Sequence, residues 1–134
     1  PAARRGSEVI LVVEDEAPVR ALVQTLLGDR GYRVVVAADG PAAIELFARH
    51  AHEVALLLTD IVMPHMSGRV LGEQLRMQAP GLKILYMSGY TSDVIGSYVS
   101  LDSKMAFLQK PFTPEALARK VREVLDGPAP RLRA

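Results

Sequence analysis

The chain has 134 residues, of which 49% are hydrophobic and 23% charged, a composition typical of a single globular domain. It contains no cysteine, which excludes disulfide bonds and thiolate metal sites and is compatible with the cytoplasm. The formal net charge of +1 does not indicate nucleic-acid binding, because it depends on four arginines in tails rich in alanine, proline and glycine: Arg4, Arg5, Arg131 and Arg133.

Strands and helices are predicted to alternate along the first half of the chain. Glu8–Val13 is a strand candidate, and Ala17–Pro18 can open a helix because proline is tolerated in the first turn. Apolar residues at helical spacing continue this helix, and Gly31 supplies its stop. Tyr32–Ala37 predicts a second strand, followed by a turn at Asp39–Gly40. The residues that repeat at helical spacing in the first helix are Val19, Leu22, Val23, Leu26 and Leu27. The inward face expected for the second helix is Ala43, Ile44, Phe47 and Ala48.

The second half of the chain continues this alternation. Val54–Gly68 begins with an apolar run that predicts a buried strand ending at Thr59–Asp60, and a loop with Pro64 and Gly68 follows. The remaining predicted elements are a helix from about Ser67 to Gln78 through Val70, Leu71 and Leu75, a strand at Leu82–Met87, a short helix at about Thr91–Tyr98, a strand at Met105–Gln109, and a helix capped by Thr113 with Leu117, Val121, Val124 and Leu125 facing inward.

Five strands that alternate with helices through short connections predict an α/β fold. Such a pattern requires parallel strands, right-handed crossovers and helices on both faces of the sheet. We interpret residues 1–7 as a linker, 8–126 as one domain and 127–134 as a tail. Because the chain begins with Pro1 rather than methionine, we expect it to be a fragment of a longer protein.

Polar residues stand at the carboxyl ends of four predicted strands. Glu14 and Asp15 follow the first strand, Asp60 ends the third, Ser88 follows the fourth, and Lys110 follows the fifth. In a parallel sheet these ends share one edge, which is where ligands bind in open α/β folds. Asp60 alone could equally cap the next element. The coincidence of all these side chains at one edge favours a shared functional site.

The residue types at this edge indicate phosphoryl chemistry. Three converging carboxylates repel one another, and without a cation one of them would keep its proton at neutral pH. Oxygen ligands without cysteine or a nearby histidine favour Mg²⁺. Lys110 would add a fixed positive charge, and Ser88 a hydroxyl that can donate to a phosphoryl oxygen. Asp60 then lies as a nucleophile opposite two cations, an arrangement suited to receiving a phosphoryl group.

Four segments together resemble the receiver domain of bacterial two-component response regulators, over about Glu8–Asp126. They are VVEDE, LLTDIVMPHMSG, YMSGY and FLQKPF. The resemblance implies a doubly wound, flavodoxin-like three-layer sandwich with strand order 2-1-3-4-5 and five helices. It also implies a cytoplasmic phosphoacceptor that takes its phosphoryl group from a histidine kinase or histidine phosphotransfer domain, and that catalyses its own phosphorylation and slow dephosphorylation.

The same resemblance implies the roles of the acidic residues. Asp60 would accept the phosphoryl group, and Asp15 and Asp60 would bind Mg²⁺ with the backbone carbonyl of Val62. Glu14 stands where aspartate is commoner in the family and would act mainly through a bound water. Val62 and Tyr90, two residues past Asp60 and Ser88 respectively, would flank the path of the attacking water and tune the lifetime of the phosphate.

The resemblance also implies how the phosphorylated state is held and sensed. Ser88 and Lys110 would hold the phosphoryl oxygens, with serine in place of the commoner threonine. Phe107 falls at the switch position, where an aromatic ring turns inward as the Ser88 hydroxyl moves; a plain core aromatic is the alternative interpretation. The Lys110–Pro111 peptide bond matches one that is cis in the family.

Other functions agree less well with the sequence. An aspartate-nucleophile phosphatase of the haloacid dehalogenase type typically carries a second aspartate where this chain has Val62. Acids at Glu14–Glu16 would repel the phosphate of a flavodoxin's FMN, and no Walker-type phosphate loop occurs. The histidines at positions 50, 52 and 65 match no motif and are interpreted as surface residues.

The parent protein is left open between two contexts. MSGYTSDVI and FLQKPFTPEALARKVREVL resemble receivers at the carboxyl end of hybrid sensor kinases, which would tether the domain to a membrane. The alternative is a free-standing single-domain response regulator. In either case output would pass through the surface of the fourth helix, fifth strand and fifth helix, with no direct contact to nucleic acid or membrane.

Overall fold

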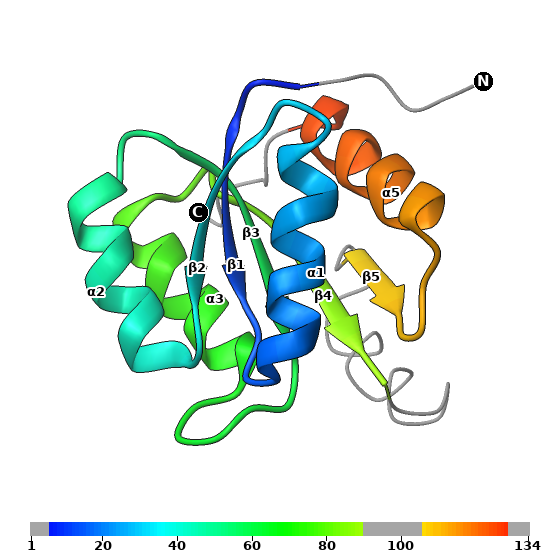
Figure 1. Cartoon of the computed structure of the whole chain (residues 1–134). Coiled ribbons are helices and arrows are strands. Elements are labelled where there is room, and N and C mark those ends of the chain that lie inside the picture. Colours follow the sequence, from blue (N-terminus) through cyan, green and yellow to red (C-terminus); the bar gives the residue numbers. More distant parts are fainter. Residues whose placement is uncertain (1–5, 90–105, 129–134) are drawn as a thin grey trace.

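The computed structural model describes residues 6–89 and 106–128, and its centre is a parallel sheet of five strands (Figure 1). The strands are Val9–Val13 (β1), Arg33–Ala37 (β2), Val54–Asp60 (β3), Lys83–Ser88 (β4) and Ala106–Gln109 (β5). They pair in the order β2-β1-β3-β4-β5, and every pair is parallel. This order confirms the doubly wound fold.

Helices cover both faces of the sheet (Figure 1). They are Ala17–Gly28 (α1), Gly40–His50 (α2), Gly68–Gln78 (α3) and Pro114–Asp126 (α5). α1 and α5 pack on one face, whereas α2 and α3 pack on the other. The short helix expected at about Thr91–Tyr98 lies outside the described residues. Within the described part of the chain, no helix combines the length and apolar composition needed to cross a bilayer.

β1 supplies side chains to both layers of the core. Leu11 and Val13 pack with α2 and α3, and Ile10 and Val12 pack with α1 and α5. Successive residues of a strand point to opposite faces, so a strand buried on both sides reads as an unbroken apolar run. This explains why the VILVV and VALLL segments predict central strands of a parallel sheet.

The apolar faces of three helices are narrower than the sequence predicts. Ala48 is exposed, so the prediction of its inward position was wrong. Leu22 and Val70, which belong to the apolar patterns of their helices, are also 54% and 43% exposed. Consecutive helical residues lie about 100° apart, and a helix lying on a sheet buries only one stripe. In each case an immediate neighbour in the sequence occupies that stripe: Val23, Leu71 and Phe47.

Side chains cap the starts of three described helices, namely Asp39 at α2, Ser67 at α3 and Thr113 at α5. Asp39 is the N-cap of α2, and its Oδ1 accepts a hydrogen bond from the amide of Ala42 at 2.9 Å. Asp39–Gly40, predicted as the turn after the second strand, thus also opens α2, because an aspartate before a helix satisfies one of the unpaired amides of the first turn. The predicted Thr113 cap of α5 is confirmed by a 3.0 Å bond from the amide of Ala116 to its hydroxyl.

The helix that Gly31 was expected to end stops earlier, at Gly28. Gly31 lies in the following connection with φ of 97°, a backbone conformation that side chains disfavour. A Cβ atom at this position would lie 2.4 Å from the carbonyl oxygen of Gly6. Gly31 therefore lets the chain before β1 cross the connection closely.

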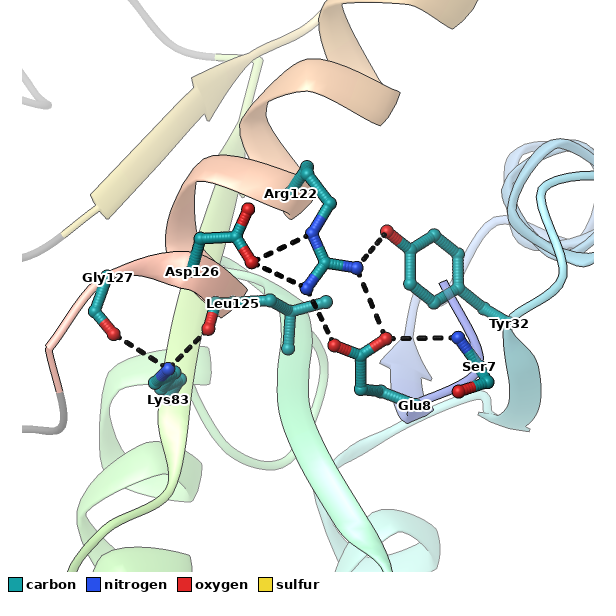
Figure 2. Close-up of polar contacts among 8 residues, drawn as sticks. All are labelled: Ser7, Glu8, Tyr32, Lys83, Arg122, Leu125, Asp126 and Gly127. Carbon is teal, nitrogen blue, oxygen red and sulfur yellow. Dashed lines mark hydrogen bonds and ion pairs between the residues drawn. The ribbon is translucent and has the colours of Figure 1, made fainter. Parts of the chain in front are cut away.

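At the end of the sheet where β1 begins, charged groups join the chain before β1 to the end of α5 (Figure 2). Nη2 of Arg122 lies 2.7 Å from Oε2 of Glu8 and 2.8 Å from Oδ1 of Asp126. Its Nη1 also donates to the hydroxyl of Tyr32 at 3.3 Å. Nearby, the ammonium of Lys83 donates to two backbone carbonyls at the end of α5. We refer to Glu8, Tyr32, Arg122 and Asp126 as the terminal clasp.

Candidate phosphoacceptor site

The opposite edge of the sheet collects the polar residues singled out in the sequence. Glu14 directly follows β1, Asp60 is the last residue of β3, Ser88 is the last of β4, and Lys110 follows β5. Ser88, at the end of β4, is in register with Gln109, the last residue of β5. Lys110 comes directly after Gln109 and therefore lies next to the end of β4. Parallel pairing therefore brings these four positions, far apart in sequence, to one rim.

Three carboxylates meet at this rim. Glu14, Asp15 and Asp60 each have an oxygen within 4.8 Å of the others. Glu14 is fully buried and Asp60 is 5% exposed, whereas Asp15 faces solvent. Two acids therefore form the floor of the cluster, and the third borders it from the solvent side.

The backbone and carboxylate of Glu14 are held from several directions. Its amide donates to the carbonyl of Ala37 at 3.1 Å, and its Oε2 accepts from the amide of Glu16 at 3.2 Å. Its carbonyl accepts a 2.8 Å hydrogen bond from Nη1 of Arg20, on the first turn of α1. Arg20 was not predicted as a site residue, although its position one helical turn after the acids is visible in the sequence.

Lys110 joins the two buried acids. Its ammonium forms an ion pair with Glu14 and lies 2.7 Å from Oδ1 of Asp60. Its amide donates to the carbonyl of Ser88 at 2.7 Å, which fixes the start of the following loop against β4. The Lys110–Pro111 peptide bond is cis, the isomer that the resemblance implies.

Burial, hydrogen bonds and charge shift the pKa values of the two buried acids in opposite directions. Burial, together with the hydrogen bond and charge of Glu14, raises the pKa of Asp60 to about 8, against the opposing effect of Lys110. Burial also tends to raise the pKa of Glu14, but hydrogen bonds with Asp60, Lys110 and the amide of Glu16 outweigh it, so this pKa lies below its ordinary value. Burial tends to lower the pKa of Lys110, but hydrogen bonds to the same two acids raise it overall.

The loop after Asp60 turns back against the residue that it follows. The amide of Gly68 donates to the carbonyl of Ile61 at 2.7 Å. A Cβ atom at Gly68 would lie 1.8 Å from the carbonyl oxygen of Asp60, so glycine alone permits this approach. His65 adopts a positive φ of 71° within the loop, and the side chain of Val62 is 49% exposed. The loop thus leaves Val62 exposed to solvent two residues from Asp60.

The side chains of β4 and β5 near the site pack through aromatic rings. Ser88 is buried, and Phe107 is half-buried against the core layer that contains α2 and α3. The ring of Phe107 lies 5.8 Å from that of Tyr86, centroid to centroid. Tyr86 was not predicted as a partner of Phe107, because a pair across two strands becomes visible only once their register is known. Tyr90 lies outside the described residues.

The donor set suits a hard divalent cation. All three converging groups are carboxylates, and oxygen ligands are those that Mg²⁺ prefers. Burial, followed by the hydrogen bond and charge of Glu14, raises the pKa of Asp60, and a bound cation would favour the charged form of this carboxyl group. The cluster found among the described residues contains no histidine. His50 instead lies 3.1 Å from Glu53.

Comparison with known proteins identifies the family. Residues 10–122 match the family of response regulator receiver domains. The chain belongs to this family, which confirms the resemblance drawn from its motifs.

Similar proteins include both sensor kinases and separate response regulators. The sensor kinase CckA of Brucella abortus (strain 2308) is 40% identical over 121 residues, covering 90% of this chain and 13% of the kinase. The crystal structure of a receiver domain from the hybrid histidine kinase CckA has a TM-score of 0.75 and 32% identity, covering 88% of this chain and 99% of that one. The chemotaxis protein CheY4 of Vibrio cholerae has a TM-score of 0.79 and 29% identity, with coverage of 89% and 99%. The chain spans about half the length of the transcriptional regulators that it also matches.

Proposed function

We propose that this domain accepts a phosphoryl group on Asp60 in two-component signal transduction. The observation that carries the proposal is the bridge formed by Lys110, whose ammonium contacts both Glu14 and Asp60 beside the carboxylate of Asp15. Asp60 is a buried aspartate that contacts an ammonium and lies beside two further acids that can hold a second cation, an arrangement suited to receiving negative charge.

The acids of this rim fit a Mg²⁺ ion. Asp15 and Asp60 would hold it together with the backbone carbonyl of Val62, and Glu14 would act mainly through a bound water. When bound, the ion supplies positive charge that offsets the carboxylates and the phosphoryl oxygens. The charges of the site support this assignment, since three carboxylates converge and the ammonium of Lys110 contacts two of them.

Asp60 performs the transfer as a nucleophile. A carboxylate oxygen of Asp60 attacks the phosphorus of a phosphohistidine, and a P–O bond forms as the P–N bond breaks. The imidazole nitrogen that leaves keeps the electron pair and takes a proton from solvent. Burial serves this step because Asp60 is 5% exposed and few waters compete with the donor.

Lys110 and Ser88 hold the product. The ammonium of Lys110, now 2.7 Å from Oδ1 of Asp60, is placed to contact a phosphoryl oxygen bonded to that carboxylate. The hydroxyl of Ser88 would donate to another oxygen. We further propose that Val62 and Tyr90 tune the lifetime of the phosphate, and that Phe107 takes part in the conformational response through packing, since phenylalanine has no hydroxyl.

The donor is a histidine kinase or a histidine phosphotransfer domain. The likeness to the sensor kinase CckA favours a hybrid kinase as the parent protein, with the free-standing regulator as the second candidate. Either parent would place this domain in the cytoplasm. Output through the face formed by the helix expected at about Thr91–Tyr98, β5 and α5 belongs to the same proposal. A haloacid dehalogenase-type phosphatase is no better supported, since the family match is to receivers.

Mass spectrometry after incubation with acetyl phosphate and Mg²⁺ tests the proposal. The wild-type domain should gain one phosphoryl group, and Asp60→Asn should gain none. Asp29→Asn, which changes an exposed aspartate at the end of α1, is the matched control and should be phosphorylated like the wild type. Undiminished incorporation in Asp60→Asn would show that another residue is the acceptor.

A further inference from the structure

Arg20 contacts the acidic rim through the backbone rather than through a carboxylate. Its Nη1 donates to the carbonyl oxygen of Glu14 at 2.8 Å, and its side chain is half-buried. Its own amide donates to the carbonyl of Glu16 at 2.9 Å, within the first turn of α1. Arg20 therefore spans the connection between β1 and α1, which carries two of the three clustered acids.

The bond from Arg20 fixes the peptide plane between Glu14 and Asp15. A peptide unit is planar, so holding its carbonyl oxygen also orients the amide and Cα of the next residue. The other side of Glu14 is already held, because its amide donates to the carbonyl of Ala37 at 3.1 Å. Without Arg20, the bond from the amide of Glu16 to Oε2 of Glu14 would be the described hydrogen bond that still spans this peptide. The carbonyl oxygen of Glu14 would lose its described partner, so the peptide plane, and with it the exposed carboxylate of Asp15, would be held less firmly.

We propose that Arg20 is a positioning residue for the acidic rim: its guanidinium holds the Glu14–Asp15 peptide so that Asp15 faces Asp60 and can share a divalent cation with it. The inference rests on the proposed function, because it names how this chain prepares the same site. Groups that orient metal ligands without touching the metal are a general feature of metal sites.

A purely electrostatic role for Arg20 predicts the opposite result. A guanidinium near three carboxylates repels a second cation, so its removal by itself would tighten Mg²⁺ binding. Loss of positioning would instead weaken binding, because Asp15 would have to be ordered when the ion binds. The sign of the change in affinity therefore distinguishes the two roles.

The experiment is a calorimetric Mg²⁺ titration of the wild type, Arg20→Ala, Arg20→Lys and the control Arg49→Ala. Arg49 carries the same charge but pairs with Glu45 on the surface of α2. We expect Arg20→Ala to weaken Mg²⁺ binding about tenfold, the lower end of what partners of metal ligands contribute. Arg20→Lys keeps the charge and has a shorter donor, so its affinity for Mg²⁺ should lie between those of the wild type and Arg20→Ala. The control Arg49→Ala should bind Mg²⁺ like the wild type.

A second measurement uses the metal-free protein. The backbone order parameter of the Asp15 amide, measured by NMR relaxation, should fall from about 0.85 in the wild type toward about 0.6 in Arg20→Ala. Affinity for Mg²⁺ that is unchanged or tighter in Arg20→Ala would overturn the positioning role while leaving the proposed function intact. A wild-type domain that binds no Mg²⁺ would overturn both.

Discussion

Oδ1 of Asp60 lies 2.7 Å from Nζ of Lys110, yet the pKa of Asp60 is raised to about 8. The two observations are compatible because burial and the neighbouring Glu14 act against the ammonium, which Glu14 also shares. One lysine thus serves two buried carboxyl groups. Without a metal ion, ionising Asp60 is therefore unfavourable, because its carboxylate is buried beside that of Glu14. Binding of a cation, or replacement of one of the two acids, would remove this cost.

Asp60→Asn should stabilise the metal-free domain, and increasingly so as the pH rises. A carboxyl whose pKa is higher in the folded than in the unfolded state contributes stability that is full below pH 4 and is lost as the pH rises toward 8. Asparagine does not titrate, so the variant escapes this loss. A pKa difference of one unit corresponds to about 1.4 kcal/mol, and we expect a gain of at least that size at pH 8.5.

Urea denaturation at pH 5.5 and 8.5, with chelator present, measures this effect. The free energy of unfolding of Asp60→Asn relative to the wild type should be larger at pH 8.5. The control Asp29→Asn should show no such pH dependence. Parallel pH profiles for wild type and Asp60→Asn would contradict the raised pKa.

Lys110→Ala should separate phosphoryl transfer from metal binding. Removing a cation that contacts two acids leaves the carboxylates available, so Mg²⁺ affinity should be retained or increased. Removing a donor that stabilises developing charge typically slows a reaction by about 10²-fold or more, and the rate of labelling by acetyl phosphate should fall accordingly. Lys120→Ala, which changes a lysine paired with Glu123 on α5, should label at the wild-type rate.

The clustering of residues at the strand ends was predictable from the sequence, because the carboxyl ends of parallel strands lie at the same edge of a sheet. Once VILVV and VALLL are identified as central strands, Glu14 and Asp60 must reach the same rim. The alternation of strands and helices fixed the fold class in the same way. These inferences need only periodicity and the polarity of single residues at strand ends.

Contacts that depend on side-chain direction were not predictable. The pair of Arg122 and Glu8 joins residues 114 positions apart, and nothing in the local pattern of either segment selects the other. The bond from Arg20 to the carbonyl of Glu14 involves a backbone group, which carries no residue-type signal. The exposure of Leu22 depends on how α1 is rotated on the sheet, which spacing alone sets only to within a residue.

Asp15→Asn should weaken Mg²⁺ binding while leaving the fold intact. Asp15 is exposed and can be changed without burying an unpaired group, so the free energy of unfolding should move by less than about 0.5 kcal/mol. As a direct ligand it should matter at least as much as partners of ligands do, giving a loss of more than about tenfold in affinity. Calorimetric titration against the wild type provides the measurement, and equal affinities would remove Asp15 from the metal site.

The terminal clasp should contribute stability that disappears in acid. Arg122 holds Glu8 through two nitrogens, and its hydrogen bond lowers the pKa of Glu8 despite partial burial. A lowered folded-state pKa gives stability that is present above about pH 4.5 and is lost as the pH falls through the folded value. Arg122→Ala should therefore lower the free energy of unfolding by about 1–2 kcal/mol at pH 7.

The difference in the free energy of unfolding between Arg122→Ala and the wild type should shrink at pH 3.5. Arg119→Ala, which changes an exposed arginine on the same helix, should cost little at either pH. A loss in Arg122→Ala that is equal at both pH values would mean that the arginine stabilises the domain by packing, without its charge.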